Sequence, residues 1–332
     1  MSRSAPLGAA DVLTLVRKRV QASSVYGEVR RPFRFFLCGD PALVASFRSI
    51  LLSGHVGDHI PLEAAATLET LDPGRPYGAA PDAKLIVFLG RPGDRSGARL
   101  DLLVPLRLPI FSVTVDPDAL PVVPLSAPQA GAVGDYVVPS IDRETLRGRI
   151  FPHLVDRCKG VEVAVGRNLP ALRETVAAKL TRDAASSALK VAAASAVVDH
   201  VPLLGIVLGA VASAGDMVAI TGIQIVLMMQ IGAVYDHEPE VADIWELLPV
   251  VGGGLGWRML SRELSGFIPV AGVAIKGAIA YAGTIVVGEG VSFYYQHGRH
   301  MTKAQAAALY EEMKRAGMGF AREMYQRLRR RP

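Results

Sequence analysis

Short apolar runs separated by polar and turn residues characterise the first half of the chain. Phe33–Cys38, Lys84–Leu89 and Pro109–Val115 are largely apolar segments with the length of buried strands. Pro41–Leu52 predicts a helix with proline in its first turn, and a second helix is predicted from about Asp142 to Cys158. Strands that alternate with helices favour a doubly wound, mostly parallel α/β sheet.

Three weaker elements complete this half. Asp135–Pro139 predicts a further short strand, and Ile60–Ala66 predicts an edge strand. Apolar residues at helical spacing over Asp11–Gln21 predict a short amphipathic helix that is followed by a linker. We therefore expect an N-terminal helix and linker over residues 1–30 and an α/β domain over residues 31–160.

The second half is patterned as helices rich in glycine and alanine, with long stretches free of charge. Pro170–Val198 predicts one such helix, and Met217–Tyr235 is a run of nineteen residues without a charged side chain. Phe267–Gly288 is a further apolar stretch, whereas Val201–Gly215 is shorter and predicts a buried or re-entrant helix. Small residues allow helix backbones to approach closely. We therefore expect an all-α hydrophobic domain over residues 165–332.

Two of these stretches approach the length of a membrane span, which takes about 20 mostly apolar residues. Met217–Tyr235 has the length but contains Gln224 and Gln230, and Phe267–Gly288 carries Lys276 near its middle. A lysine at the centre of a bilayer costs about 2.5–3.5 kcal/mol, which offsets most of the gain from the apolar residues around it. We therefore expect a helical domain that inserts into a membrane or packs against it.

The positive charge of the chain is concentrated at its C-terminal end. The 332 residues have a formal net charge of +5. Residues 302–332 contain eight Lys and Arg against three acids, and this difference of five equals the net charge of the whole chain. A basic tail beside an apolar body favours anionic lipid headgroups as the partner. Nucleic acid is not expected, because aromatic residues do not interleave with a basic face. The predicted lipid-facing residues are Arg327, Arg329, Arg330 and Arg331.

Cysteine usage and the N-terminus indicate the compartment. Cys38 and Cys158 are the only cysteines, and neither has a second ligand at metal spacing, which favours a reducing environment. No continuous apolar stretch precedes Arg17, so no signal peptide is predicted. We expect a protein at the cytoplasmic membrane with its N-terminal domain facing the cytoplasm.

The loop after the first predicted strand is the place where an α/β sheet of this kind binds phosphates. Against the phosphate-loop pattern G-x-x-x-x-G-K-[ST], Gly39 and Ser46 match, but Val44 replaces the second glycine and Ala45 replaces the lysine. Asp40 adds a negative charge to the same loop. The chain therefore lacks the residues that would hold a nucleotide there, and we expect no cofactor.

The loops after the next two strands lack nucleotide-handling residues as well. The second strand is followed by Gly90 and Arg91, with no acid to hold Mg²⁺. The third strand leads into Val115-Asp116-Pro117-Asp118. This segment has an acid at the last position of the guanine-reading pattern N-K-x-D, but it lacks the Asn and the Lys of that pattern. Over residues 33–158, strand spacing resembles a Ras/Era-type GTPase domain that has lost these residues. A phospho-receiver domain is an alternative, but it would need a phosphorylatable Asp where Gly90 and Arg91 stand.

A second resemblance covers about Thr181 to Tyr295. It rests on Gly215-Asp216-Met217 continuing through Gln224 to Tyr235, on Phe267-Ile268-Pro269-Val270-Ala271-Gly272, and on Ala280-Tyr281-Ala282-Gly283-Thr284 with Gly288. These motifs resemble a bacterial hydrophobic domain of unknown function that is found with Era-type GTPases. The resemblance implies a membrane-associated helical domain that is coupled to a GTPase and has no known catalysis.

Charged residues inside the apolar segments are candidates for a buried site. Asp216 and Lys276 lie where an unpaired charge is expensive, so we expect them to form a buried ion pair or to face a wet cavity. His237, Glu238 and Glu240 could form a metal cluster, but Pro239 interrupts them and we interpret them as a solvated loop. No metal site is expected.

The last helix carries a clear start signal. Thr302 as the N-cap and Gln305 three residues later predict a capping box. Apolar residues at helical spacing then predict a helix with one packed side and a basic C-terminal end.

Together these patterns predict a membrane-associated adaptor or regulatory scaffold without enzymatic turnover. Its partners would be anionic lipids and a GTPase or other membrane protein, and a homo-oligomer is an open alternative. Two other functions stay open at this point. One is a GTP-binding protein with an unorthodox phosphate loop, and the other is a soluble helical interaction protein.

Overall fold

The computed structural model describes residues 22–55, 57, 59–72, 80–94, 103–118, 132–198, 205–238 and 272–329. Side chains are not described at residues 22–24, 104, 132–133, 194–198, 205–218, 272–274 and 321–329. The chain divides into two compact units, Gly27–Val176 and Met1–Tyr26 with Ala177–Pro332. We call the first the α/β unit and the second the helical unit. The predicted helix Asp11–Gln21 lies outside the described residues, and the first described helix is α2 (Ala22–Val29).

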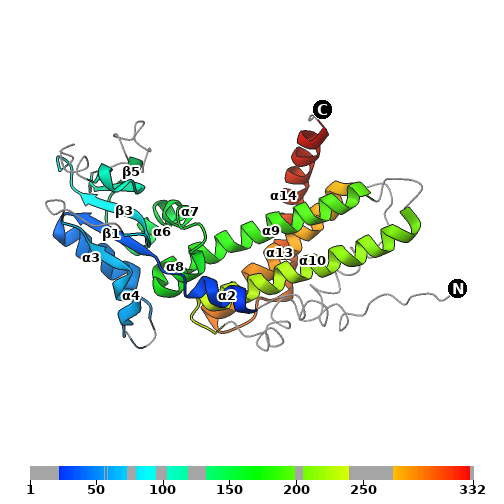
Figure 1. Ribbon diagram of the computed structural model, residues 1–332, viewed down its shortest axis with the longest axis horizontal. Coiled ribbons are helices and arrows are strands. Elements are labelled where there is room, and N and C mark those ends of the chain that lie inside the picture. The colour runs from blue at the N-terminus through cyan, green and yellow to red at the C-terminus, as the bar shows by residue number, and fades with distance from the viewer. Residues whose placement is uncertain are drawn as a thin grey trace. The chain divides into compact units, whose positions relative to one another are not determined.

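The α/β unit is built on a five-stranded, all-parallel sheet (Figure 1). Its spatial order is β2-β1-β3-β4-β5. The strands are β2 (Leu68–Thr70), β1 (Arg34–Gly39), β3 (Ala83–Gly90), β4 (Ile110–Val115) and β5 (Ala132–Val138). The parallel α/β sheet predicted from the sequence is confirmed. The observed order is the flavodoxin-like one, which receiver modules share, and its direction reverses between β1 and β3.

The strand at the open edge is not the predicted one. Ile60–Ala66 was expected to be a strand, but this prediction is wrong, because Leu62–Ala66 forms the short helix α4 and the edge strand β2 follows it. Leu62–Ala66 contains three alanines, which favour a helix over a strand. The Arg48 side chain holds this corner, because it donates to the carbonyl oxygens of Ala65 and Leu68.

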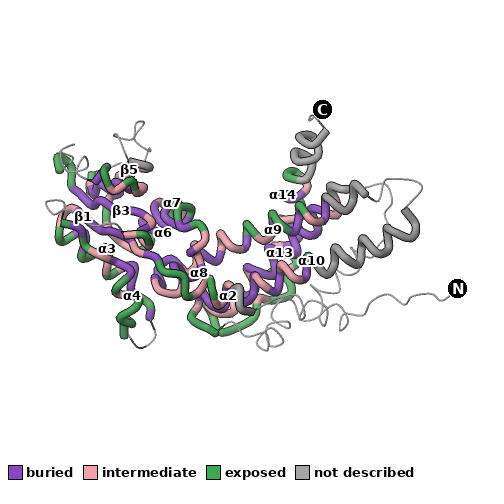
Figure 2. The backbone as a smooth tube through the Cα atoms, viewed as in Figure 1, coloured by how far each residue is buried: buried purple, intermediate pink, exposed green. Residues whose placement is uncertain are grey.

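Large apolar side chains fill both faces of the sheet, and Figure 2 shows the buried residues concentrated in its strands. On one face the buried side chains of Phe36, Cys38, Ile86, Phe88 and Ile110 pack together with residues that follow the strands. The other face is covered in part by α3 (Pro41–Leu52), which packs against β1 and β3. This helix has the bounds predicted from the sequence.

The helix predicted from Asp142 to Cys158 is two helices. These are α6 (Arg143–Arg149) and α7 (Phe151–Asp156), and the single helix is therefore a wrong prediction. Pro152, in the first turn of α7, has no N–H to continue the hydrogen-bond ladder of α6, which explains the break. Two short elements follow, α8 (Glu162–Asn168) and η3 (Pro170–Leu172), and η3 packs against α3 and α6.

Four long helices make up most of what the structure describes of the helical unit: α9 (Arg173–Val198), α10 (Gly205–Val234), α13 (Gly272–His297) and α14 (Lys303–Arg329). The predicted helical C-terminal region is confirmed. The separate short helix expected over Val201–Gly215 is a wrong prediction, because α10 runs without a break through Gly215 and Asp216. Helix α14 begins with the expected capping box: the Gln305 N–H donates to Thr302 Oγ1 at 3.2 Å and Gln305 Oε1 accepts from the Thr302 N–H at 3.0 Å.

Helix α13 lies at the centre of this packing. Residues 277–292 are buried apart from Glu289, which is intermediate. A Cβ at Gly288 would lie 2.2 Å from Thr181 Oγ1 of α9, and one at Gly317 of α14 would lie 3.1 Å from the Ala278 Cα. Glycines therefore allow α9 and α14 to approach α13 closely, as the small-residue pattern predicts. Among the described residues, no helix is both long and apolar enough to cross a membrane.

Candidate functional site

The candidate site lies at the carboxyl ends of β1 and β3, where the strand order reverses. Open α/β sheets bind their ligands in the crevice at such a point. The chain leaves β1 at Gly39 and enters α3 at Pro41, so Asp40 alone separates the strand from the helix. On the neighbouring strand, β3 ends at Gly90 and Arg91 follows. These two short connections decide what the site can hold.

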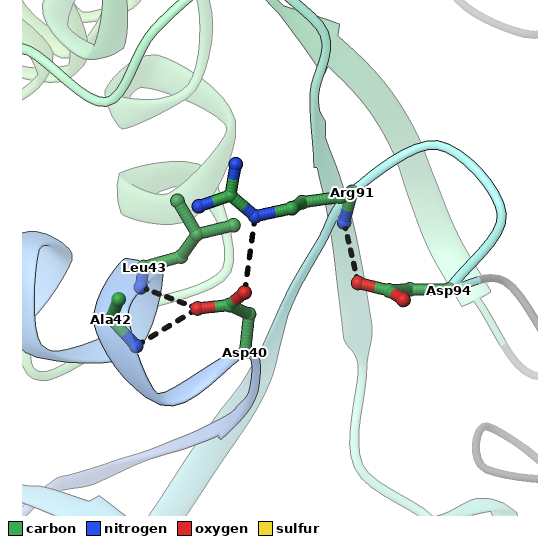
Figure 3. Close-up of polar contacts among 5 residues, drawn as sticks. All are labelled: Asp40, Ala42, Leu43, Arg91 and Asp94. Carbon is green, nitrogen blue, oxygen red and sulfur yellow. Dashed lines mark hydrogen bonds and ion pairs between the residues drawn. The ribbon is translucent and has the colours of Figure 1, made fainter.

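Asp40 occupies the amino end of α3 with its own carboxylate (Figure 3). Its Oδ1 accepts from the Ala42 N–H at 2.8 Å and from the Leu43 N–H at 3.1 Å. These amide groups at the start of a helix are the ones that would otherwise receive a phosphate. The helix end is therefore satisfied from within the chain.

Arg91 completes the arrangement from the neighbouring strand. Its Nε lies 3.1 Å from the second carboxylate oxygen of Asp40, so the two residues form an ion pair across the switch point. The backbone N–H of Arg91 donates to Asp94 Oδ2 at 3.0 Å, which holds the turn after β3. The guanidinium that follows β3 is thus already paired with the Asp40 carboxylate.

Hydrogen bonds and charge keep Asp40 ionised. The Leu43 amide lowers the pKa of the Asp40 carboxyl most strongly, and the hydrogen bond from Arg91 lowers it further. Asp40 therefore carries a full negative charge at neutral pH, in the place where a phosphate oxygen would have to lie.

The backbone geometry requires glycine at position 39, independently of phosphate binding. Its φ is +116°, and a Cβ built on it would lie 1.9 Å from the carbonyl oxygen of Leu89 in β3. The next amide, that of Asp40, donates to the same oxygen at 2.8 Å. Only glycine permits this close approach of two backbones.

The remaining residues of the predicted phosphate loop lie within α3. Val44 is buried in the core, whereas Ala45 and Ser46 face outward on the helix. Because the helix starts at Pro41, no loop is present that could wrap around a phosphate. The match of Gly39 and Ser46 to the phosphate-loop pattern therefore does not correspond to a loop of that shape.

Acids at the ends of β4 and β5 are bound to their own turns. Asp116 Oδ1 accepts from the Asp118 N–H at 3.1 Å, and Asp142 caps α6 by accepting from the Thr145 N–H at 2.8 Å. Hydrogen bonds lower the pKa of the Asp142 carboxyl to about 2. The largest contribution comes from the Ser140 hydroxyl, and the next comes from Thr145. Within the described ranges, no three His, Cys, Asp or Glu residues are placed to hold a metal ion.

The predicted residues of the helical unit are only partly described. Lys276 is half-buried near the start of α13, but the side chain of Asp216 lies outside the described residues, so the ion pair stays a prediction. The side chains of Arg327 and Arg329 are likewise outside them, as are Arg330 and Arg331 altogether. His237 and Glu238 are exposed, and the His237 ring lies 4.5 Å from that of Tyr295, whereas Glu240 is not described.

The pairing of Asp40 with Arg91 is the feature that sequence reasoning missed. Each residue was noted by itself, Asp40 as an added charge and Arg91 as the residue in place of an acid. A usable signal was present, because each follows a buried parallel strand and the carboxyl ends of neighbouring parallel strands lie at one edge.

Comparison of the chain with protein-family models, with curated proteins and with solved structures finds no match.

Proposed function

We propose that this protein is a membrane-associated adaptor or regulatory scaffold that works without catalytic turnover. In this proposal the α/β unit is a degenerate switch module. It is either the GTPase-like kind expected from the strand spacing or the receiver kind that shares the observed strand order. Neither kind keeps its chemistry here: Ala45 stands in place of the phosphate-loop lysine, and Arg91 in place of a phosphorylatable aspartate.

One observation carries this proposal. The Asp40 carboxylate accepts from the amides of Ala42 and Leu43 and pairs with Arg91, so an internal anion fills the site of an external one. A nucleotide phosphate would have to displace a charged group that three donors hold in place. Nucleotide binding is therefore disfavoured by charge repulsion and by the loss of these hydrogen bonds.

The membrane part of the proposal rests on charge distribution. The excess of five positive charges in residues 302–332 favours anionic headgroups, each nearby Lys or Arg contributing about 1 kcal/mol. The burial of α13 by helices of the same chain favours a second candidate, a soluble helical interaction protein. Fractionation without detergent distinguishes the two candidates, because the full chain remains in the supernatant if the second candidate is correct and sediments with membranes if the first is correct.

The test of the site is a calorimetric titration of the full chain. We expect no heat of binding with GTP and Mg²⁺ in the micromolar range. A micromolar GTP affinity would overturn the proposal and favour the alternative of an unorthodox phosphate loop.

A gain of function tests the same site positively. Asp40→Ala frees the amides of Ala42 and Leu43 and the guanidinium of Arg91, so this variant should bind inorganic phosphate weakly where the wild type does not. Asp94→Ala is the matched control, because the Asp94 carboxylate accepts from the backbone N–H of Arg91. Equal phosphate binding by the wild type and Asp40→Ala would show that Asp40 does not close the site.

A further inference from the structure

The connection between α13 and α14 carries basic residues and no acid. Residues 290–310 contain no Asp or Glu, and the structure describes every side chain in this range. Four exposed basic residues lie within it, namely His297, Arg299, His300 and Lys303, which we call the basic turn. The positive charge of the basic turn is therefore not offset by any acid in the same stretch of chain.

Lys303 stands where the stability of α14 gives it no role. It is the first residue of α14, and the amino end of a helix carries a partial positive charge. A cation at that position opposes the helix dipole and costs stability, whereas an anion bound beside it would be favourable. The charge of Lys303 therefore suits an external anion better than it suits the helix.

Aromatic rings hold the cations of the basic turn in place. The His297 ring stacks on Phe293 with 4.2 Å between centroids, and the Arg299 guanidinium carbon lies 5.0 Å from the centre of the same ring. The His300 ring stacks on Tyr294 at 5.2 Å. A guanidinium that lies over a ring keeps N–H groups at its edge that can donate to phosphate oxygens. These contacts therefore orient the basic turn for anion binding.

The end of α10 lies against a different side of α13. The Tyr235 hydroxyl lies 3.1 Å from Ser292 Oγ, and the exposed acids Asp236 and Glu238 follow Tyr235. Successive residues of an α-helix point about 100° apart, so Phe293 lies on another side of α13 than Ser292 does. The two acids therefore accompany the side of α13 that faces α10, and the ring of Phe293 belongs to the other side.

We propose that the basic turn docks to anionic lipid headgroups, with the half-buried rings of Phe293 and Tyr294 at the boundary between headgroups and acyl chains. Aromatic side chains are enriched at that depth, and basic residues beside them pair with phosphates. Because both rings already stack on histidines, base stacking and hence a nucleic acid is disfavoured. This inference rests on the membrane association proposed above and adds which surface makes the contact.

The direction of α14 supplies one residue for a control. Tyr310 packs with Val286 of α13, whereas Gly317, farther along α14, approaches Ala278. Residue numbers rise on one helix as they fall on the other, so α14 is antiparallel to α13. At 1.5 Å per residue, the exposed Arg315 lies about 18 Å along α14 from its first residue. Arg315 is therefore a basic residue of the same helix that lies away from the basic turn.

Helix α9 supplies the other control residue. Ala185 packs with Ile285 of α13, whereas Ala192 packs with Ala280, so α9 is also antiparallel to α13. The exposed Lys190 lies between these two contacts and thus beside the middle of α13. Along the axis of α13, this position is about 20 Å from the basic turn.

Vesicle flotation with matched charge-reversal variants of the full chain tests the inference. The turn variant is Arg299→Glu with Lys303→Glu, and the control is Lys190→Glu with Arg315→Glu, which changes the net charge equally. With vesicles of phosphatidylcholine and phosphatidylglycerol, we expect the turn variant to bind more than about tenfold more weakly than the wild type. The control should stay within about twofold of the wild type.

A third variant compares the basic turn with the basic C-terminal tail. Arg327→Glu with Arg329→Glu reverses two of the arginines that the sequence predicts to face lipid. We expect this variant to lose less binding than the turn variant. If the tail variant loses binding and the turn variant keeps it, lipid contact through the basic turn is wrong and the membrane association stands.

The other outcomes also separate this inference from the proposed function. If the wild type binds neither anionic nor pure phosphatidylcholine vesicles, the membrane association itself is wrong. If the wild type binds both kinds of vesicle equally well, or if the turn variant and the control lose binding alike, only the docking of the basic turn is overturned.

A depth measurement gives a readout that does not depend on charge reversal. Single cysteines at the exposed positions Ala304 and Ala316 of α14 would carry a fluorophore, since native Cys38 and Cys158 are buried. On anionic vesicles, brominated lipid should quench the fluorophore at Ala304→Cys and leave the one at Ala316→Cys, about 18 Å farther along the helix, unaffected. Equal quenching at both positions, or quenching at neither, would contradict the inference.

Discussion

The two units bury their apolar residues in different ways. In the α/β unit, large side chains such as Phe35, Phe47 and Phe111 are fully buried between the sheet and its covering segments. In the helical unit, the central helix α13 is buried mainly through small residues, among them Ala278, Ala280 and Ala282. The first arrangement gains stability from the area of each side chain, and the second from the close approach of backbones.

This difference decides where each unit tolerates change. A core of large side chains keeps its backbones apart. A position that has no room for a Cβ is therefore exceptional there, and Gly39, at the connection between β1 and α3, is such a position. A core of small residues has its backbones in near contact, so a methyl group added where two helices touch forces them apart. Three substitutions test the comparison, in order of decreasing expected effect.

The largest effect is expected for Gly39→Ala. The new Cβ would lie 1.9 Å from the Leu89 carbonyl oxygen at a φ of +116°, so β1 and β3 must separate. We expect a loss of about 3 kcal/mol or more in the free energy of unfolding, measured by hydrogen exchange of the β1 and β3 amides.

The matched control for this substitution is Gly93→Ala. Gly93 also has a positive φ, +92°, but a Cβ there would meet nothing within 4 Å. A loss of about 1 kcal/mol is expected from the backbone conformation alone. Equal losses for the two variants would show that close approach of the strands is not what requires Gly39.

An intermediate effect is expected for Gly288→Ala in the helical unit. The added Cβ would lie 2.2 Å from Thr181 Oγ1, so α9 and α13 must shift apart or Thr181 must change its rotamer. We expect the free energy of unfolding to fall by about 1–3 kcal/mol. Hydrogen exchange of the amides in α9 and α13 measures this loss.

For the control Gly222→Ala in α10, the expected change in the free energy of unfolding has the opposite sign. Nothing lies within 4 Å of a Cβ at Gly222, so the substitution only improves helix propensity, with a gain of about 0.5–1 kcal/mol. If Gly288→Ala were also stabilising, close packing by small residues would not hold this unit together.

The smallest effect is expected for Glu289→Gln, and it depends on pH. Burial raises the pKa of the Glu289 carboxyl above 4.5, and the positive charge of Arg182 opposes this only in part. The folded state therefore holds this proton more tightly than the unfolded state. Stability contributed by the proton is fully present below pH 4.5 and is lost as pH rises through the folded pKa.

The Gln variant removes this dependence because its side chain does not titrate. We expect denaturation midpoints of the wild type to fall relative to those of Glu289→Gln as pH rises above 4.5, with urea titrations at several pH values as the measurement. Parallel midpoints over this range would indicate that the Glu289 carboxyl is effectively solvated.

The sequence by itself determined the kind of elements and most of their positions. Apolar runs of strand length located β1, β3 and β4, and the proline at the start of α3 together with Thr302 and Gln305 in α14 located two helix starts. Such signals are local, because strand length, helix caps and proline geometry depend on neighbouring residues. The missing phosphate-loop glycine and lysine, at Val44 and Ala45, were also evident from local pattern alone.

Tertiary structure decided which residues meet. The strand order, the use of Leu68–Thr70 as the edge strand and the pairing of Asp40 with Arg91 join residues as much as 51 positions apart. The continuity of α10 through Gly215 and the directions of the helices around α13 are equally non-local. Contacts of this kind depend on the packing of whole elements, whose free energy is spread over many side chains that a local pattern does not record.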